Sequence, residues 1–200
     1  DSMLVPVSWL KQFATWPCTL AELQERITLA GLEVASVQTV GESWDRETIL
    51  VGEVVSVRQH PNADRLVLVT VRYGAGEPLE VVTGAPNLHI GDAGQKVVFA
   101  MEGAVLRDPY AEGVKYSKLK RSRIRGVESA GMVCSEKELG ISEEHTGILL
   151  LPEDAPVGVP FADYYGDTVI EIDLTPNLAR CFSVLGVARE VAALTGGSFH

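Results

Sequence analysis

A series of short apolar segments separated by turn residues is the feature that most limits how this chain can fold. Four such segments, each rich in Val, Ile or Leu, cover residues 49–57, 66–73, 79–83 and 96–101. Residues that favour turns lie between them, as in His60-Pro61-Asn62 and Gly91-Asp92-Ala93-Gly94. Further short strands are expected at 132–134 and 148–151. Short strands at this spacing, with no helical pattern between them, predict a small closed β-barrel rather than a parallel sheet.

The two ends of the chain have a different pattern, with one helix and one strand each. At the N-terminal end, Thr19 and Glu22 have the spacing of a capping box at the start of a helix, and residues 32–37 alternate like a half-buried strand. At the C-terminal end, residues 169–174 alternate cleanly, and residues 181–195 have an apolar stripe at helical spacing. Each end therefore supplies one helix and one strand to a small α/β unit.

Together these patterns predict an α+β fold in which the barrel is inserted into an α/β unit formed by the two chain ends. We expect residues 1–40 and 152–200 to form this discontinuous domain and residues 41–151 to form the barrel domain. No apolar run approaches the roughly 20 residues needed to cross a bilayer, so no membrane partner is expected. The three cysteines are odd in number and lack metal-binding spacing, which favours buried thiols in a reducing cytoplasm.

The distribution of charge says more about partners than the net charge of -10, which by itself argues against nucleic acid. Six of the eleven residues from Lys115 to Arg125 are Lys or Arg, and none is acidic. Such a run supplies the positive charge that phosphate backbones attract. Charge alone leaves a solvated loop equally open, but the clustering within an acidic chain favours RNA.

Other residues that are able to do chemistry lack the partners that chemistry needs. Ser129, Cys134 and Ser135 are potential nucleophiles, but no His and carboxylate lie near them in sequence. The histidines and cysteines have no metal-binding spacing, and no phosphate-binding glycine motif is present. His60 and its neighbours indicate turn chemistry, and Arg65 lies where it can reach a phosphate. We therefore expect no catalytic residue, no metal site and no cofactor in this chain.

Three segments in order resemble the tRNA-binding OB domain: His60-Pro61-Asn62-Ala63-Asp64-Arg65-Leu66, the segment 81–87, and the segment 120–135. This module occurs in some methionyl-tRNA synthetases, in free-standing tRNA-binding proteins, and near the start of the bacterial phenylalanyl-tRNA synthetase beta subunit. The flanking segments 3–13 and 175–194 resemble those of the beta subunit. The resemblance covers essentially the whole chain and is to the N-terminal segment of that family.

The resemblance implies an OB-fold barrel that contacts tRNA. The resemblance and the charge pattern together indicate these residues as tRNA contacts: Arg65, Asn87, Lys118, Lys120, Arg121, Arg123, Arg125 and Ser129. By family, the beta subunit is longer and assembles with an alpha subunit, two copies of each. The alpha subunit holds ATP, magnesium and phenylalanine, so the resemblance implies ATP and Mg in the parent complex, a cytoplasmic location, and a non-catalytic role for this segment.

The chain departs from the family pattern at Leu178-Ala179-Arg180, where Arg-Pro-Asp is usual. An Asp at the last of these positions would cap the following helix, whereas Arg180 cannot accept that hydrogen bond, which puts the start of the helix in doubt. Thr83 also stands where a Cys is common.

Two other functions remain open on the sequence. One is a structural module that helps the synthetase assemble and has little contact with RNA, which the acidic flanks favour. The other is a free-standing tRNA-binding OB protein, which the flanking segments disfavour. An independent hydrolase is a remote further alternative.

Overall fold

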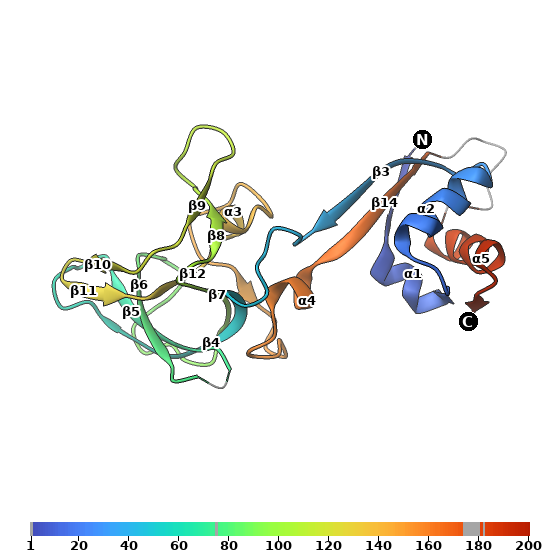
Figure 1. Cartoon of the computed structure of the whole chain (residues 1–200). Coiled ribbons are helices and arrows are strands. Elements are labelled where there is room, and N and C mark those ends of the chain that lie inside the picture. Colours follow the sequence, from blue (N-terminus) through green and yellow to red (C-terminus); the bar gives the residue numbers. More distant parts are fainter. Residues whose placement is uncertain (1, 75, 174–180, 182) are drawn as a thin grey trace. The chain divides into compact units, whose positions relative to one another are not determined.

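The computed structural model describes all residues except 1, 75, 174–180 and 182. Its contacts divide the chain into two units, Asp1–Val40 with Gly166–His200, and Gly41–Tyr165 (Figure 1). The second boundary between these units thus lies after Tyr165, whereas the sequence predicted it after residue 151. The reason is Phe161, which is fully buried in the barrel unit with its ring centroid 4.6 Å from that of Trp44. That the two units are separate domains stays a prediction.

The terminal unit is a three-stranded antiparallel sheet packed with three helices. Its strands, in sheet order, are β1 (Ser2–Pro6), β14 (Asp167–Asp173) and β3 (Glu33–Val40). Its helices are α1 (Val7–Phe13), α2 (Leu20–Leu29) and α5 (Val184–Thr195), and β2 (Ala14–Thr15) pairs with β15 (Ser198–Phe199). Both ends of the chain contribute to one core, with members such as Leu10, Ile27, Ile170 and Val191. This shared core is what brings the two ends of the chain together in one unit.

The caps of two helices bear directly on the sequence predictions. The capping box of α2 is confirmed, since Glu22 N–H donates to Thr19 Oγ1 and Thr19 N–H donates to the Glu22 carboxylate. Helix α5 is capped by Ser183, whose Oγ accepts from Gly186 N–H at 3.0 Å. The start of α5 therefore has a cap without an acidic residue before it. Leu178-Ala179-Arg180 itself lies outside the described residues.

The second unit is an OB-type barrel. Its strands are β4 (Ile49–Gln59), β5 (Val67–Arg72), β6 (Leu79–Thr83), β7 (Lys96–Met101) and β12 (Gly131–Val133), with β13 (Leu150–Leu151) also paired to β7. The sheet order is β12-β7-β4-β5-β6, and β6 approaches β12, so the sheet is nearly closed. Fully buried Val69, Val81, Val97 and Phe99 fill its interior. The four predicted central strands are confirmed, and the chain is an α+β protein.

Several short elements between β7 and the end of the barrel were not predicted. They are β8 (Val105–Arg107) paired with β9 (Tyr116–Lys118), β10 (Ser122–Ile124) paired with β11 (Val127–Ser129), and the helices α3 (Glu136–Leu139) and α4 (Phe161–Tyr165). The basic run from Lys115 to Arg125 is thus not one extended segment, because β9 and β10 belong to two different hairpins.

Candidate nucleic-acid interface

The hairpin of β10 and β11 is attached to the turn that joins β4 to β5. His60 in this turn is only 2% exposed. Asn62 N–H donates to His60 Nδ1 at 3.0 Å, which places the imidazole proton on Nε2, and Nε2 donates to Ile124 O at 3.1 Å. Asn62 Nδ2 donates to Arg125 O at 3.0 Å. Two segments far apart in the sequence, one with Arg65 and one with the basic run, are therefore held together.

The tip of this hairpin is a two-residue loop with an unusual residue in it. Arg125 has φ of 49° and Gly126 has φ of 90°, between the paired residues Ile124 and Val127. Positive φ at both central positions is the requirement of the type I′ turn, which Asn-Gly or Asp-Gly usually fills. Among the described residues, Arg125 alone has positive φ without being glycine. An Arg side chain does not stabilise this backbone conformation, so Arg125 places an exposed cation at the tip of the hairpin at a conformational cost.

Two of the residues expected to contact RNA, Ser129 and Asn87, make hydrogen bonds within the barrel. Ser129 is 3% exposed, and its Oγ accepts from Val82 N–H at 3.1 Å and donates to Gly131 O at 2.9 Å. The Asn87 amide donates to Ile148 O at 2.8 Å and accepts from Ile148 N–H at 3.0 Å. The Ser129 hydroxyl is thus buried, and the half-buried Asn87 amide joins two barrel segments.

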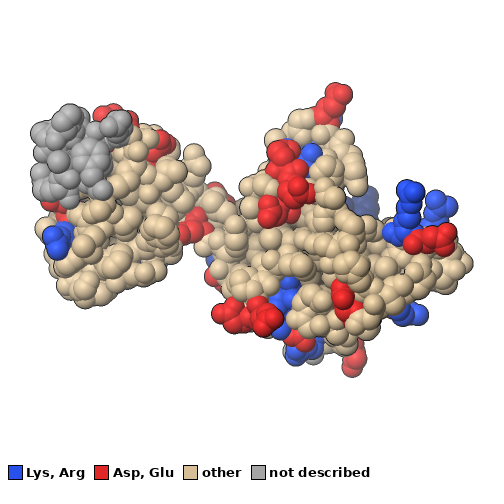
Figure 2. Space-filling model, turned by 180° about the vertical axis from the view of Figure 1, so that it is seen from behind, with Lys and Arg blue, Asp and Glu red and all other residues tan. Residues whose placement is uncertain are grey.

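Ion pairing separates the cations of the barrel unit into two groups. Seven have a carboxylate partner: Arg46, Arg58, Arg72, Lys96, Arg107, Arg121 and Lys137. Six exposed ones have no ion pair within the described part of the chain: Arg65, Lys115, Lys118, Lys120, Arg123 and Arg125. Figure 2 shows Lys and Arg side chains gathering at the end of the barrel where β10 and β11 lie. The unpaired positive charge is therefore local.

Arg121 differs from its neighbours in the basic run. Its Nη1 lies 2.6 Å from Glu128 Oε1, and its Nε lies 3.5 Å from Glu102 Oε2. The hydrogen bond to Glu128 raises the pKa of Arg121, with the charges of Glu128 and Glu102 adding to the effect. Because these carboxylates offset its charge, Arg121 is a weaker candidate for a phosphate contact than Lys120 or Arg123.

Among the described residues, the possible nucleophiles that the sequence offers are buried, and one of them caps a helix. Cys134 is fully buried, and this burial raises the pKa of its thiol well above the usual value, so the reactive thiolate is disfavoured. Ser135 caps α3 through its contacts with Glu138. Within the described residues, no group of three or more His, Cys, Asp or Glu side chains is arranged to hold a metal ion. None of the described helices has the length and apolar character to cross a membrane.

The chain is similar to known proteins over nearly its whole length. Residues 49–160 match a family described as "Putative tRNA binding domain". The chain is 50% identical over 96% of its length to a phenylalanine–tRNA ligase beta subunit of Dehalococcoides mccartyi, and 48% identical over 97% to that of Ralstonia nicotianae. It spans 23% of the length of each of these relatives and corresponds to their N-terminal region.

A solved structure of a protein related to methionyl-tRNA synthetase, from Pyrococcus horikoshii, is similar to 56% of the chain and to 86% of its own chain. Its sequence identity is 24% and its TM-score is 0.38. The family match, in contrast, covers more than half of the chain and includes the barrel strands, the attached hairpin and the turn beneath it. The chain therefore belongs to the tRNA-binding domain family.

Proposed function

We propose that this chain binds tRNA through the unpaired cations at the β10–β11 end of its barrel, as part of a phenylalanine–tRNA ligase beta subunit. The observation that carries the proposal is that, among the described Lys and Arg side chains of the barrel unit, those without an ion pair are confined to Arg65 and the run 115–125. Cations already offset by carboxylates attract phosphates weakly, whereas these six are available to RNA. The rest of the barrel unit is rich in carboxylates, which repel RNA and so orient it toward this end.

The contacts that we propose are Arg65, Lys118, Lys120, Arg123 and Arg125, with Arg121 in a lesser role. Contacts of this kind hold and orient an RNA backbone but do not distinguish its bases. We therefore expect the cation cluster to contribute affinity and orientation rather than selection among tRNAs. Within a phenylalanine–tRNA ligase, selection for one tRNA would then rest on other parts of the enzyme.

The relatives support proposals about the parent protein as well. We expect it to assemble with an alpha subunit, two copies of each, and the complex to join phenylalanine to tRNA with ATP and Mg. Because charged tRNA is consumed in translation, we expect a cytoplasmic location. This chain would bind and orient the tRNA, with the chemistry located elsewhere in the complex.

A structural assembly module is the alternative that one observation favours. The terminal unit exposes large apolar side chains, with Leu4 at 63%, Trp9 at 55% and Leu29 at 81%. Exposed apolar groups of this size are typical of surfaces that pack against protein. The two functions are compatible if the barrel contacts RNA and the terminal unit contacts protein.

Binding of the chain to unfractionated tRNA over a range of salt concentrations tests the proposed function. We expect log affinity to fall linearly with log salt, with a slope of about 0.7–0.9 for each phosphate contact. Five contacts would give a slope of roughly 4. A slope near zero, or no binding at low salt, would contradict the proposal and favour the assembly module.

Arg125→Asn should separate the stability of the hairpin from its affinity for RNA. Asn adopts positive φ more readily than Arg, and the Arg125 carbonyl that Asn62 contacts is kept, so we expect an unfolding midpoint equal to or above that of the wild type. Losing one phosphate contact should weaken tRNA binding about 5-fold and lower the salt slope by about 1. Thermal unfolding and tRNA titration measure the two effects, and unchanged affinity would exclude Arg125 as a contact.

A further inference from the structure

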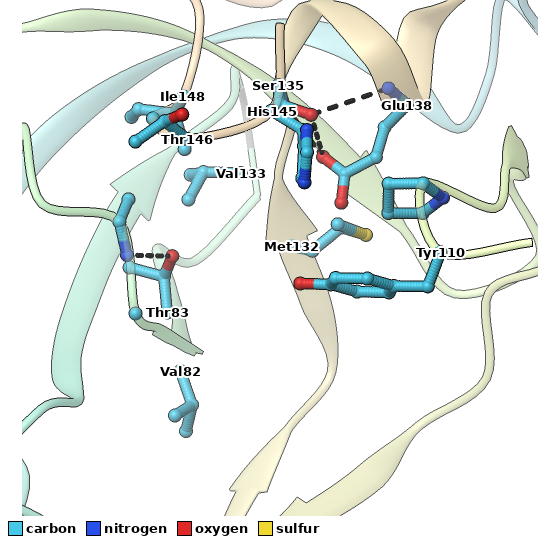
Figure 3. A pocket seen from close by; sticks show the side chains of 14 residues that line it. Val82, Thr83, Tyr110, Met132, Val133, Ser135, Glu138, His145, Thr146 and Ile148 are labelled. Atoms are coloured by element: carbon cyan, nitrogen blue, oxygen red, sulfur yellow. Dashed lines mark hydrogen bonds between the residues drawn. The ribbon is translucent and has the colours of Figure 1, made fainter. Parts of the chain in front are cut away.

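We propose that a hollow between β6 and β12 accepts one unstacked nucleobase that carries an exocyclic amino group. The hollow has a volume of about 280 Å³, and its lining includes Thr83, Tyr110, Met132, Glu138, His145 and Thr146 (Figure 3). In this view Tyr110, His145 and Glu138 lie on one side and Thr83 and Thr146 on the other. The inference deepens the proposed function, because the base would belong to the bound RNA.

An exposed aromatic side chain gives the hollow a stacking surface. Tyr110 is 86% exposed, and its ring meets that of His145 edge to face with 6.0 Å between ring centroids. The loop carrying it is fixed locally, since Tyr110 N–H donates to Asp108 Oδ1 at 2.9 Å. Every base has an apolar face that stacks on such a ring, and stacking of this kind is the usual way in which OB barrels hold single strands.

The charge of the hollow favours a base over a phosphate. No Lys or Arg is among the residues that line it. Glu138 is held in place by Ser135, whose N–H and Oγ both contact Glu138 Oε2, at 2.6 and 2.9 Å. The other carboxylate oxygen has no hydrogen bond among the described residues, and Figure 3 shows the carboxylate pointing into the hollow. A carboxylate repels phosphate but accepts a hydrogen bond from an amino group such as N4 of cytosine.

The hollow is continuous with the cation cluster along the chain. Val82, which lines it, donates its N–H to Ser129 at the end of β11. Tyr110 belongs to the loop between β8 and β9, and that loop leads into Lys115 and Lys118. We therefore expect a single strand held by phosphates at the hairpin to reach the hollow, where one unstacked base can enter. In this arrangement the cations outside the hollow bind the phosphates, and the carboxylate within it binds the base.

Titration of the chain with cytidine and with uridine, followed by NMR, tests the site. These nucleosides carry no phosphate, so their binding is independent of the cation cluster. We expect cytidine at millimolar concentration to shift the amide signals of Thr83 and Thr146, and uridine to bind at least about 5-fold more weakly. Tyr110→Ala should weaken cytidine binding about 10-fold, whereas Tyr110→Phe should keep it. Glu138→Gln, which keeps the capping box, should remove the preference for cytidine over uridine.

Each outcome decides a different point. Tyr110 is exposed, so Tyr110→Ala should leave the folded spectrum intact and its effect reports on the ligand. No response to either nucleoside, or an equal response in Tyr110→Ala, would overturn the site whatever tRNA binding shows. A cytidine response without any binding of tRNA would keep the site and remove the proposed function instead.

Discussion

Replacing Lys120, Arg123 and Arg125 together by Gln is expected to weaken tRNA binding on the order of 100-fold at near-physiological salt. All three are exposed and have no ion pair among the described residues, so each is available to neutralise a phosphate. Each lost contact should also lower the salt slope by about 1, and the variant should therefore lose about 3. Titration of tRNA at several salt concentrations measures both quantities in one series.

The matched control replaces Arg46, Arg58 and Arg72 by Gln, which removes the same number of positive charges from the same unit. These side chains are paired with Asp163, Glu80 and Glu53 respectively. Because those carboxylates already offset their charge, we expect only a few-fold loss of affinity and an unchanged slope. Exposed pairs of this kind stabilise a fold by about 0–1 kcal/mol, so the control should remain folded. Equal losses in the two variants would mean that net charge, and not the hairpin, governs binding.

The barrel strands were predictable because each one is a run of apolar residues bounded by turn residues. β6 and β7, for example, match the expected segments 79–83 and 96–101 residue for residue. The hairpins between them were not predictable by the same rule. β9 is exposed along its whole length, so it has no alternation to detect. The turn between β10 and β11 contains Arg125, a residue type that does not indicate positive φ.

The candidate site was predicted in part, for a related reason. The charge pattern identified the cations, because charge is a property of the residue itself. It did not reveal which of them are paired, since Arg121 meets Glu102 and Glu128 only once the hairpin has formed. Ser129 and Asn87 lie in the segments that carry the family resemblance, but the structure shows that their polar atoms join barrel segments to one another. A residue in a segment that identifies the family can therefore serve the fold and need not contact a ligand.

His60 shows most clearly what local sequence leaves out. Its neighbours Pro61 and Asn62 indicate a turn, and nothing near it in sequence reveals a partner. The partner is the carbonyl of Ile124, 64 residues away. A histidine in this position is able to accept from one backbone N–H and donate to a distant carbonyl, and so it connects a turn to a hairpin.

His60→Ala is accordingly expected to destabilise the chain by about 2–4 kcal/mol and to weaken tRNA binding about 10-fold without removing a cation. The change empties a buried site and leaves the N–H of Asn62 and the carbonyl of Ile124 without their partner. The hairpin then loses a main attachment, and its cations are no longer ordered toward the same RNA. Denaturant unfolding gives the free energy, and tRNA titration well below the unfolding midpoint gives the affinity of the folded protein.

His89→Ala supplies the comparison, because His89 is an exposed histidine of the same barrel with a side chain 74% exposed. We expect it to change stability by less than about 0.5 kcal/mol and to leave tRNA binding unaltered. If His60→Ala lowers stability but the folded variant binds tRNA like the wild type, the orientation of the hairpin is irrelevant to binding. If it lowers both while every Lys and Arg is retained, the affinity depends on where the turn holds the cations and not on their number alone.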